Sequence, residues 1–119
     1  MLTTWRQHAA FRTGRFNPIE LARTPNAKVV LACFEPGQFI PVHKPGVDLA
    51  LLVLEGSGRF ADDAGEHPLE AGSLAFVPAG SQRGIRADTR MVVLHVVTPP
   101  PTEADHQGVA AGLKRGTWR

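Results

Sequence analysis

Hydrophobic residues in this chain occur in short runs, and residues that favour turns separate the runs. The separators include Pro36-Gly37, Pro45-Gly46 and Glu55-Gly56, and the runs between them are rich in Val, Leu, Ile and Phe. The pattern predicts strands at residues 27–34, 38–43, 48–54, 57–61, 66–69, 73–77, 82–87 and 91–98. Short strands at near-regular spacing, with Gly and Pro between them, are typical of an all-β sandwich or barrel.

The strand pattern leaves residues 1–26 as an N-terminal arm. We expect this arm to be extended or irregular, with Trp5, Phe11 and Phe16 packing as its anchors. Residues 1–28 carry five basic side chains and one acidic side chain, whereas residues 29–101 carry five basic and eight acidic ones. The arm is therefore expected to dock on the barrel of its own subunit or of a partner.

The predicted barrel covers residues 27–101 and ends at Pro99-Pro100-Pro101. Proline lacks the N–H group that a strand ladder needs, so three in a row end the sheet. Residues 102–119 form a C-terminal tail. Thr102 is a suitable start for a short helix, but Gly108 and Gly112 disfavour one. A loop, a marginal helix or disorder is expected for this tail.

Two of the predicted strands are apolar on both faces. In the strand at 48–54, side chains alternate between Leu49, Leu51 and Val53 on one face and Ala50, Leu52 and Leu54 on the other. The strand at 91–98 has the same pattern, interrupted only by His95. Strands of this kind are usually buried on both faces. One face would line a barrel, and a second subunit or the arm would cover the other, so we predict a homodimer.

Two stretches, GQFIPVHKPGVDLALLVLEG at 37–56 and GSLAFVPAGSQRG at 72–84, resemble the two sequence motifs of the cupin family. The residues that match the motifs are Gly37, His43, Gly56, Gly72, Pro78 and Gly80. The resemblance implies a jelly-roll barrel, also called a double-stranded β-helix. It covers roughly residues 27 to 101.

The resemblance does not extend to most of the family's metal ligands. The second His of the family pattern is Pro45, the Glu is Leu49 and the last His is Arg83, so only His43 is kept. A metal site needs several imidazoles and a carboxylate aimed at one point. We therefore expect no metal cofactor. The alternative is an atypical site, in which a one-residue bulge turns Asp48 inward to join His43 and His95.

Arg83 is the most informative of these replacements. If the turn at Pro78 holds it where the family has its last His, it points into the barrel, where a buried arginine needs a partner. Either Asp48 or Glu35 neutralises it within the chain, or a ligand carboxylate or phosphate does so. The expected ligand-binding residues are His43, Asp48, Leu49, Arg83 and His95. His43 is also the candidate catalytic acid or base.

Composition narrows the classes of function. The chain has 119 residues, a formal net charge of +2 and one cysteine, Cys33, which excludes an internal disulfide. No apolar run approaches the roughly 20 residues of a membrane span, and the N-terminus lacks the apolar core of a secretory signal. We expect a cytoplasmic protein without a membrane partner. The arginines of the arm are scattered, which argues against nucleic-acid binding.

Two functions from different classes follow from these residues. The first is a binding module that holds a small organic anion in the barrel without the usual metal. The second is an enzyme that uses the same pocket. It would be an isomerase-, lyase- or epimerase-like enzyme acting through His43, or a dioxygenase with the atypical metal site.

Overall fold

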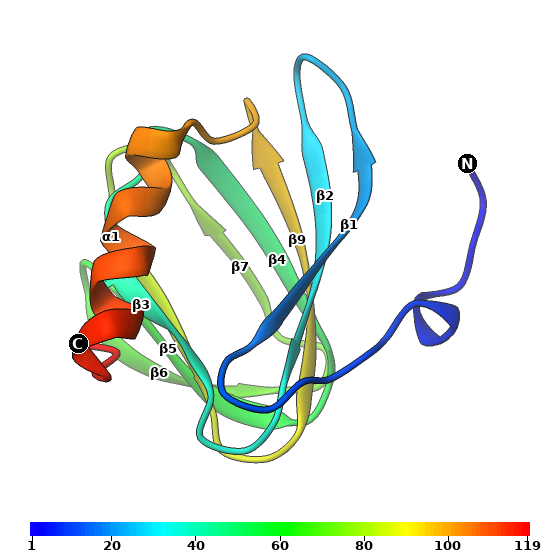
Figure 1. The fold of residues 1–119 in the computed structure, drawn as a ribbon, viewed down its shortest axis with the longest axis horizontal. Coiled ribbons are helices and arrows are strands. Elements are labelled where there is room, and N and C mark those ends of the chain that lie inside the picture. Colours follow the sequence, from blue (N-terminus) through cyan, green and yellow to red (C-terminus); the bar gives the residue numbers. More distant parts are fainter.

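A computed structural model describes residues 1–119 as two antiparallel β-sheets, a 3₁₀ turn and one α-helix (Figure 1). The elements are η1 (Trp5–Gln7), β1 (Asn17–Arg23), β2 (Lys28–Phe34), β3 (Phe39–His43), β4 (Asp48–Glu55), β5 (Ser57–Asp62), β6 (Gly65–Glu70), β7 (Leu74–Val77), β8 (Arg83–Ala87), β9 (Met91–Thr98) and α1 (Glu103–Arg115). One sheet has the order β1-β2-β9-β4-β7 and the other β3-β8-β5-β6. All neighbouring strands run antiparallel, so the predicted all-β class is confirmed.

The two sheets face each other, and their inward side chains form the main core. Leu49, Leu51 and Val53 of β4 are buried in it, as their alternation predicted. Phe60 and Ile85 meet them from the other sheet. Each predicted strand from 27 to 98 lies within one residue of an observed one at both ends.

Glycines in the two motif stretches, 37–56 and 72–84, occupy backbone positions that other residues rarely adopt. Those at 37, 56, 72 and 80 all have positive φ, in the left-handed region that favours glycine. At Gly56 there is a second reason, since a Cβ there would overlap the backbone of Arg90. The spacing of these glycines in the sequence therefore follows from the positive φ that the backbone adopts at each of these positions.

The N-terminal arm is shorter than predicted. Asn17–Arg23 is not irregular but forms β1, which pairs with β2 along its length. Phe16, just before it, is buried in the main core with its ring centroid 5.6 Å from that of Phe34. The strand was missed because Pro18 and the polar residues around it hide the alternation of Ile19 and Leu21.

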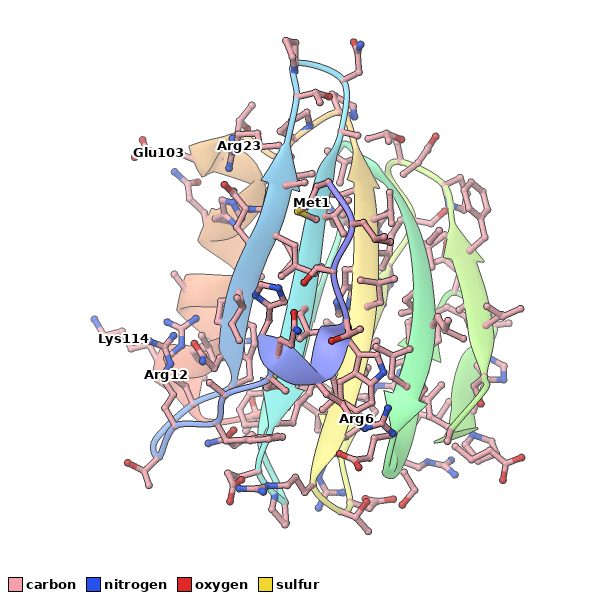
Figure 2. The ribbon with its side chains drawn as sticks, turned by 90° about the vertical axis from the view of Figure 1, so that its right-hand side faces the viewer. Met1, Arg6, Arg12, Arg23, Glu103 and Lys114 are labelled. Carbon is pink, nitrogen blue, oxygen red and sulfur yellow. The ribbon has the colours of Figure 1, made fainter.

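Residues 1–11 cross the outer face of the five-stranded sheet (Figures 1 and 2). There Trp5 and Phe11 pack against a second apolar cluster, formed by Leu31, Cys33 and Val92. The guanidinium of Arg90 lies 3.9 Å from the centroid of the Phe11 ring. The arm thus covers part of the outer apolar face from within the same chain.

The C-terminal tail contains a 13-residue helix, α1, where the sequence predicted at most a marginal one. A capping box starts it: the Asp105 N–H donates to Thr102 Oγ1, and Asp105 Oδ2 accepts from the Thr102 N–H at 2.9 Å. Gly116, with φ +79°, ends it. No helix in the chain is both long enough and apolar enough to cross a membrane.

The two glycines that disfavoured this helix are the positions where it packs on β3. A Cβ at Gly112 would overlap the ring of Pro41, and a Cβ at Gly108 would lie 2.9 Å from the Cβ of His43. Both glycines lie one turn apart on the same helix face. Close packing against β3 therefore offsets the lower helix propensity, and places α1 beside His43.

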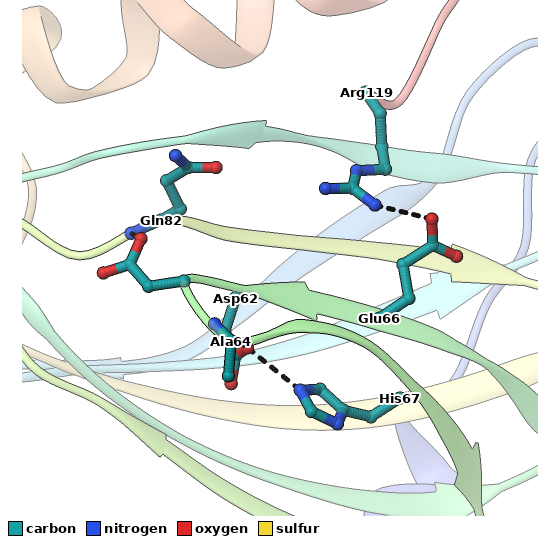
Figure 3. A network of polar contacts seen from close by, with 7 residues as sticks. Asp62, Ala64, Glu66, His67, Gln82 and Arg119 are labelled. Atoms are coloured by element: carbon teal, nitrogen blue, oxygen red, sulfur yellow. Dashed lines mark hydrogen bonds and ion pairs between the residues drawn. The ribbon is translucent and has the colours of Figure 1, made fainter.

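The end of the chain is held to the four-stranded sheet. The Val42 N–H donates to the Trp118 carbonyl at 2.7 Å, and Arg119 Nη1 lies 2.6 Å from Glu66 Oε2. Figure 3 shows Arg119 reaching Glu66 beside a separate contact between His67 and Asp62 on β6 and β5. The contacts of Trp118 and Arg119 hold the segment after α1 against β3 and β6.

Part of the outer face of the five-stranded sheet stays uncovered. Leu74 and Phe76 are 78% and 67% exposed, and they pair in register with Leu52 and Ala50 of β4. We predict that a second copy of the chain covers this face. Phe76→Asp should weaken the dimer at least 30-fold, because aromatic residues at the centre of an interface commonly contribute about 2 kcal/mol or more.

Sedimentation equilibrium at micromolar concentrations measures this effect. Gln107→Asp, an exposed change on α1, is the matched control and should leave association unchanged. A wild-type protein that stays monomeric would contradict the prediction.

We predict that Gly112→Ala destabilises the protein by up to about 2 kcal/mol. Helix propensity alone would stabilise it by about 1 kcal/mol, but the added methyl overlaps Pro41, and overpacking costs roughly 1–3 kcal/mol. Urea unfolding measures whether the variant has a lower or a higher free energy of unfolding than the wild type. Ala111→Gly, at an exposed site on the same helix, controls for propensity and should cost about 1 kcal/mol. A more stable Gly112→Ala protein would mean that α1 does not pack closely on β3.

Candidate ligand-binding site

The barrel encloses one well-formed cavity of about 230 Å³ between the two sheets and α1. Most of its wall is apolar, with Val47, Leu49, Leu51, Phe60, Ile85 and Val97 among the lining residues. Ligand pockets for drug-sized molecules are usually 300–1,000 Å³. This cavity therefore suits a smaller organic molecule.

Arg83 is the charged residue buried in this wall, with 4% of its surface exposed. Its Nη2 donates to the carbonyls of Pro78 at 2.9 Å and Ser81 at 3.4 Å, so the turn before β8 holds the side chain in place. Its Nε and Nη1 are buried without any hydrogen-bond partner. Burial lowers the pKa of the guanidinium, and the more distant charges of Asp48 and Asp105 offset part of this effect. An arginine stays protonated all the same.

Neither predicted internal partner neutralises Arg83. Asp48 Oδ1 accepts the Ala79 N–H at 2.8 Å, and Glu35 pairs with Arg90, also at 2.8 Å. Both carboxylates are thus engaged elsewhere. Two nitrogen atoms of the guanidinium, Nε and Nη1, therefore have no acceptor within the chain.

His43 lies opposite Arg83 in the pairing of β3 with β8, so both side chains project from one face of that sheet. Its Nδ1 is 2.8 Å from the Pro41 carbonyl, and because a carbonyl only accepts, Nδ1 carries the proton. Nε2 is therefore left as an acceptor. Burial lowers the pKa of His43, the carbonyl contact partly offsets this, and the charge of Arg83 lowers it further.

His95 lines the same cavity from β9 of the opposite sheet. It is 9% exposed, and burial lowers its pKa to about 4. The charges of Arg83 and His43 act in the same direction. At neutral pH both imidazoles are neutral, and the guanidinium is the one full charge deep in the cavity.

The structure brings four of the five predicted ligand-binding residues together and leaves one out. His43, Leu49, Arg83 and His95 all line the cavity, whereas Asp48 does not. The bulge that would turn Asp48 inward is absent, since β4 pairs with β9 without interruption from Asp48 to Val53 and shifts register only after that. No three His, Cys, Asp or Glu side chains group together as metal ligands.

Several residues at the cavity mouth were not predicted from the sequence. Lys28 begins β2, while Asp105, His106 and Val109 line the cavity from α1. On a helix, residues three and four apart share a face, so the spacing of Asp105, His106 and Val109 would have grouped them. That signal was lost because the glycines of the tail disfavoured a helix.

Comparisons with known proteins agree with this architecture. The sequence profile of the cupin domain family matches residues 30–97. Protein TT1209 of Thermus thermophilus superposes with a TM-score of 0.78 at 26% identity, covering 82% of this chain and 96% of that one. An RmlC-like cupin of Desulfovibrio desulfuricans is 33% identical, with a TM-score of 0.70 over 76% of this chain and 89% of its own.

A protein of Klebsiella pneumoniae with a double-stranded β-helix domain is 20% identical, with a TM-score of 0.76 over 82% of this chain and 89% of its own, which supports the fold alone. A search of proteins with curated functions found no match. The family profile spans more than half of the chain, and its limits enclose β4, β8 and most of β9, the strands that carry Leu49, Arg83 and His95. The chain therefore belongs to the cupin family.

Proposed function

We propose that this cupin binds a small organic anion in its barrel, with Arg83 as the clamp and without the metal ion usual in the family. The observation that carries the proposal is the guanidinium of Arg83, which is 4% exposed and has two nitrogen atoms with no partner. A buried donor without an acceptor costs about 1–3 kcal/mol, and more when it is charged. A carboxylate or phosphate in the cavity would remove that cost through charge-assisted hydrogen bonds.

The residues of the cavity do not fit the family's metal ion. Its deep part offers two imidazoles, His43 and His95, and no carboxylate, because Asp48 lies outside the lining. The adjacent guanidinium of Arg83 would repel a divalent cation. A dioxygenase with Asp48 as a third metal ligand is for that reason not part of the proposal.

A second candidate is an isomerase- or lyase-like enzyme that works on the same bound anion. The observation that favours it is the tautomer of His43, which leaves Nε2 free to accept a proton beside Arg83. A neutral imidazole next to a fixed positive charge is suited to act as a general base on a substrate whose developing negative charge the guanidinium stabilises.

Replacing Arg83 tests the clamp. In the wild type, an anion at 100 times its Kd adds about 2.7 kcal/mol of stability, which raises Tm by several degrees. We expect Arg83→Leu to lose this shift for C3–C6 carboxylates and for inorganic phosphate. The ligand-free variant should be at least as stable as the wild type, because an unpaired buried charge is gone.

Arg86→Leu is the matched control. Arg86 lies on the same strand, β8, but its side chain is exposed. Differential scanning fluorimetry of the three proteins gives the comparison. A ligand shift that survives in a folded Arg83→Leu protein would rule out the clamp.

Metal content is a separate test. Untagged protein purified without chelators should contain far less than one equivalent of iron, manganese, zinc or nickel. Inductively coupled plasma mass spectrometry measures this. A stoichiometric transition metal that is lost in a His43→Ala variant would overturn the metal-free assignment.

A further inference from the structure

The cavity has basic residues at its mouth as well as at its deep end. Lys28 and His106 line the same cavity as Arg83, and we call them the basic mouth. His106 is exposed and Lys28 is half-buried, whereas Arg83 is buried, so the two positive regions lie at different depths. The basic mouth is built from two separate segments, the start of β2 and the first turn of α1.

Neither residue of the basic mouth takes part in an ion pair. The charge of Asp105 offsets part of the positive charge at His106. Asp105 is the one acidic residue that lines the cavity, and both its oxygens are engaged, Oδ1 by the Gly46 N–H at 2.9 Å and Oδ2 by the Thr102 N–H at 2.9 Å.

The charges at the mouth also affect one another. Burial lowers the pKa of His106, and the positive charge of Lys28 lowers it further. A second anion placed here would relieve this repulsion.

Apart from the imidazoles of His43 and His95, most of the cavity wall is apolar, and Val30, Val47 and Val97 are among its aliphatic residues. A ligand that reaches from Arg83 to the basic mouth therefore meets a cationic group at each end and mostly hydrocarbon elsewhere. Polar atoms that face this hydrocarbon would lose their water without gaining a partner.

We infer that the ligand of this cavity has two anionic groups joined by a short apolar spacer, as in an aliphatic α,ω-dicarboxylate. One carboxylate lies on Arg83, and the other lies at the basic mouth beside Lys28 and His106. This inference rests on the proposed binding of an anion at Arg83. It adds the second contact, which selects dianions over monoanions of the same length.

The test compares succinate, glutarate and adipate with butyrate, valerate and hexanoate, which have the same numbers of carbon atoms but one carboxylate. Isothermal titration calorimetry at pH 7.5 measures Kd for the wild type, Lys28→Met and Arg83→Leu. Lys114→Met, which removes a lysine that does not line this cavity, is the matched control.

At least one dicarboxylate should bind the wild type several-fold more tightly than its monocarboxylate. Lys28→Met should weaken that dicarboxylate about two- to fivefold, since exposed charge pairs contribute modestly. It should leave the monocarboxylate and the Tm of the ligand-free protein unchanged. Arg83→Leu should weaken both kinds of ligand, and Lys114→Met neither.

A second measurement is the pKa of His106, obtained by NMR titration of its ring protons with and without ligand. A dicarboxylate should raise this pKa, because a nearby anion favours the charged imidazole, and a monocarboxylate should not. Equal binding of monocarboxylates and dicarboxylates would overturn the second contact while leaving the clamp intact. Binding of neither, together with an unchanged Tm, would overturn the clamp and the inference together.

Discussion

A guanidinium enclosed in an apolar barrel is the constraint around which the rest of this structure is arranged. Taking an ion out of water raises the free energy of the folded state by several kcal/mol unless a nearby opposite charge compensates for the lost hydration. Here the neighbouring carboxylates are occupied: Asp48 by a backbone N–H and Glu35 by Arg90. The folded chain thus keeps a positive charge in a small enclosed space. An anion that fits would stabilise this arrangement, which is the physical basis for the proposed binding.

The sequence predicted the barrel well because turns and alternation are local properties. The motif glycines at 37, 56, 72 and 80 all have a positive φ, and β4, on one side of Gly56, alternates in burial as its sequence predicted. The family resemblance identified His43 and Arg83 as candidate site residues, and the structure pairs these two residues directly between β3 and β8. These are the parts of the fold in which residues near in sequence determine the structure.

The parts that could not be predicted depend on contacts between residues far apart in sequence. Gly108 and Gly112 lower helix propensity when they are considered alone, and only the position of Pro41 and His43 shows why a side chain there is excluded. Likewise, β1 is recognisable as a strand mainly through its partner β2. The site shares this limit. His43 and Arg83 were in the motifs, whereas Lys28 and His106 reach the cavity only once β1, β2 and α1 have come together.

The hydrogen bond between Trp118 and Val42 bears on the tendency of this protein to aggregate at high concentration. β3 is an outermost strand of its sheet, with β8 on one side and no strand on the other. A bare strand edge invites another polypeptide to add to it and is a common origin of aggregation. The Trp118 carbonyl occupies the Val42 N–H on β3, and α1 packs over the same strand. The last residues of the chain therefore protect a strand edge that could otherwise pair with another polypeptide.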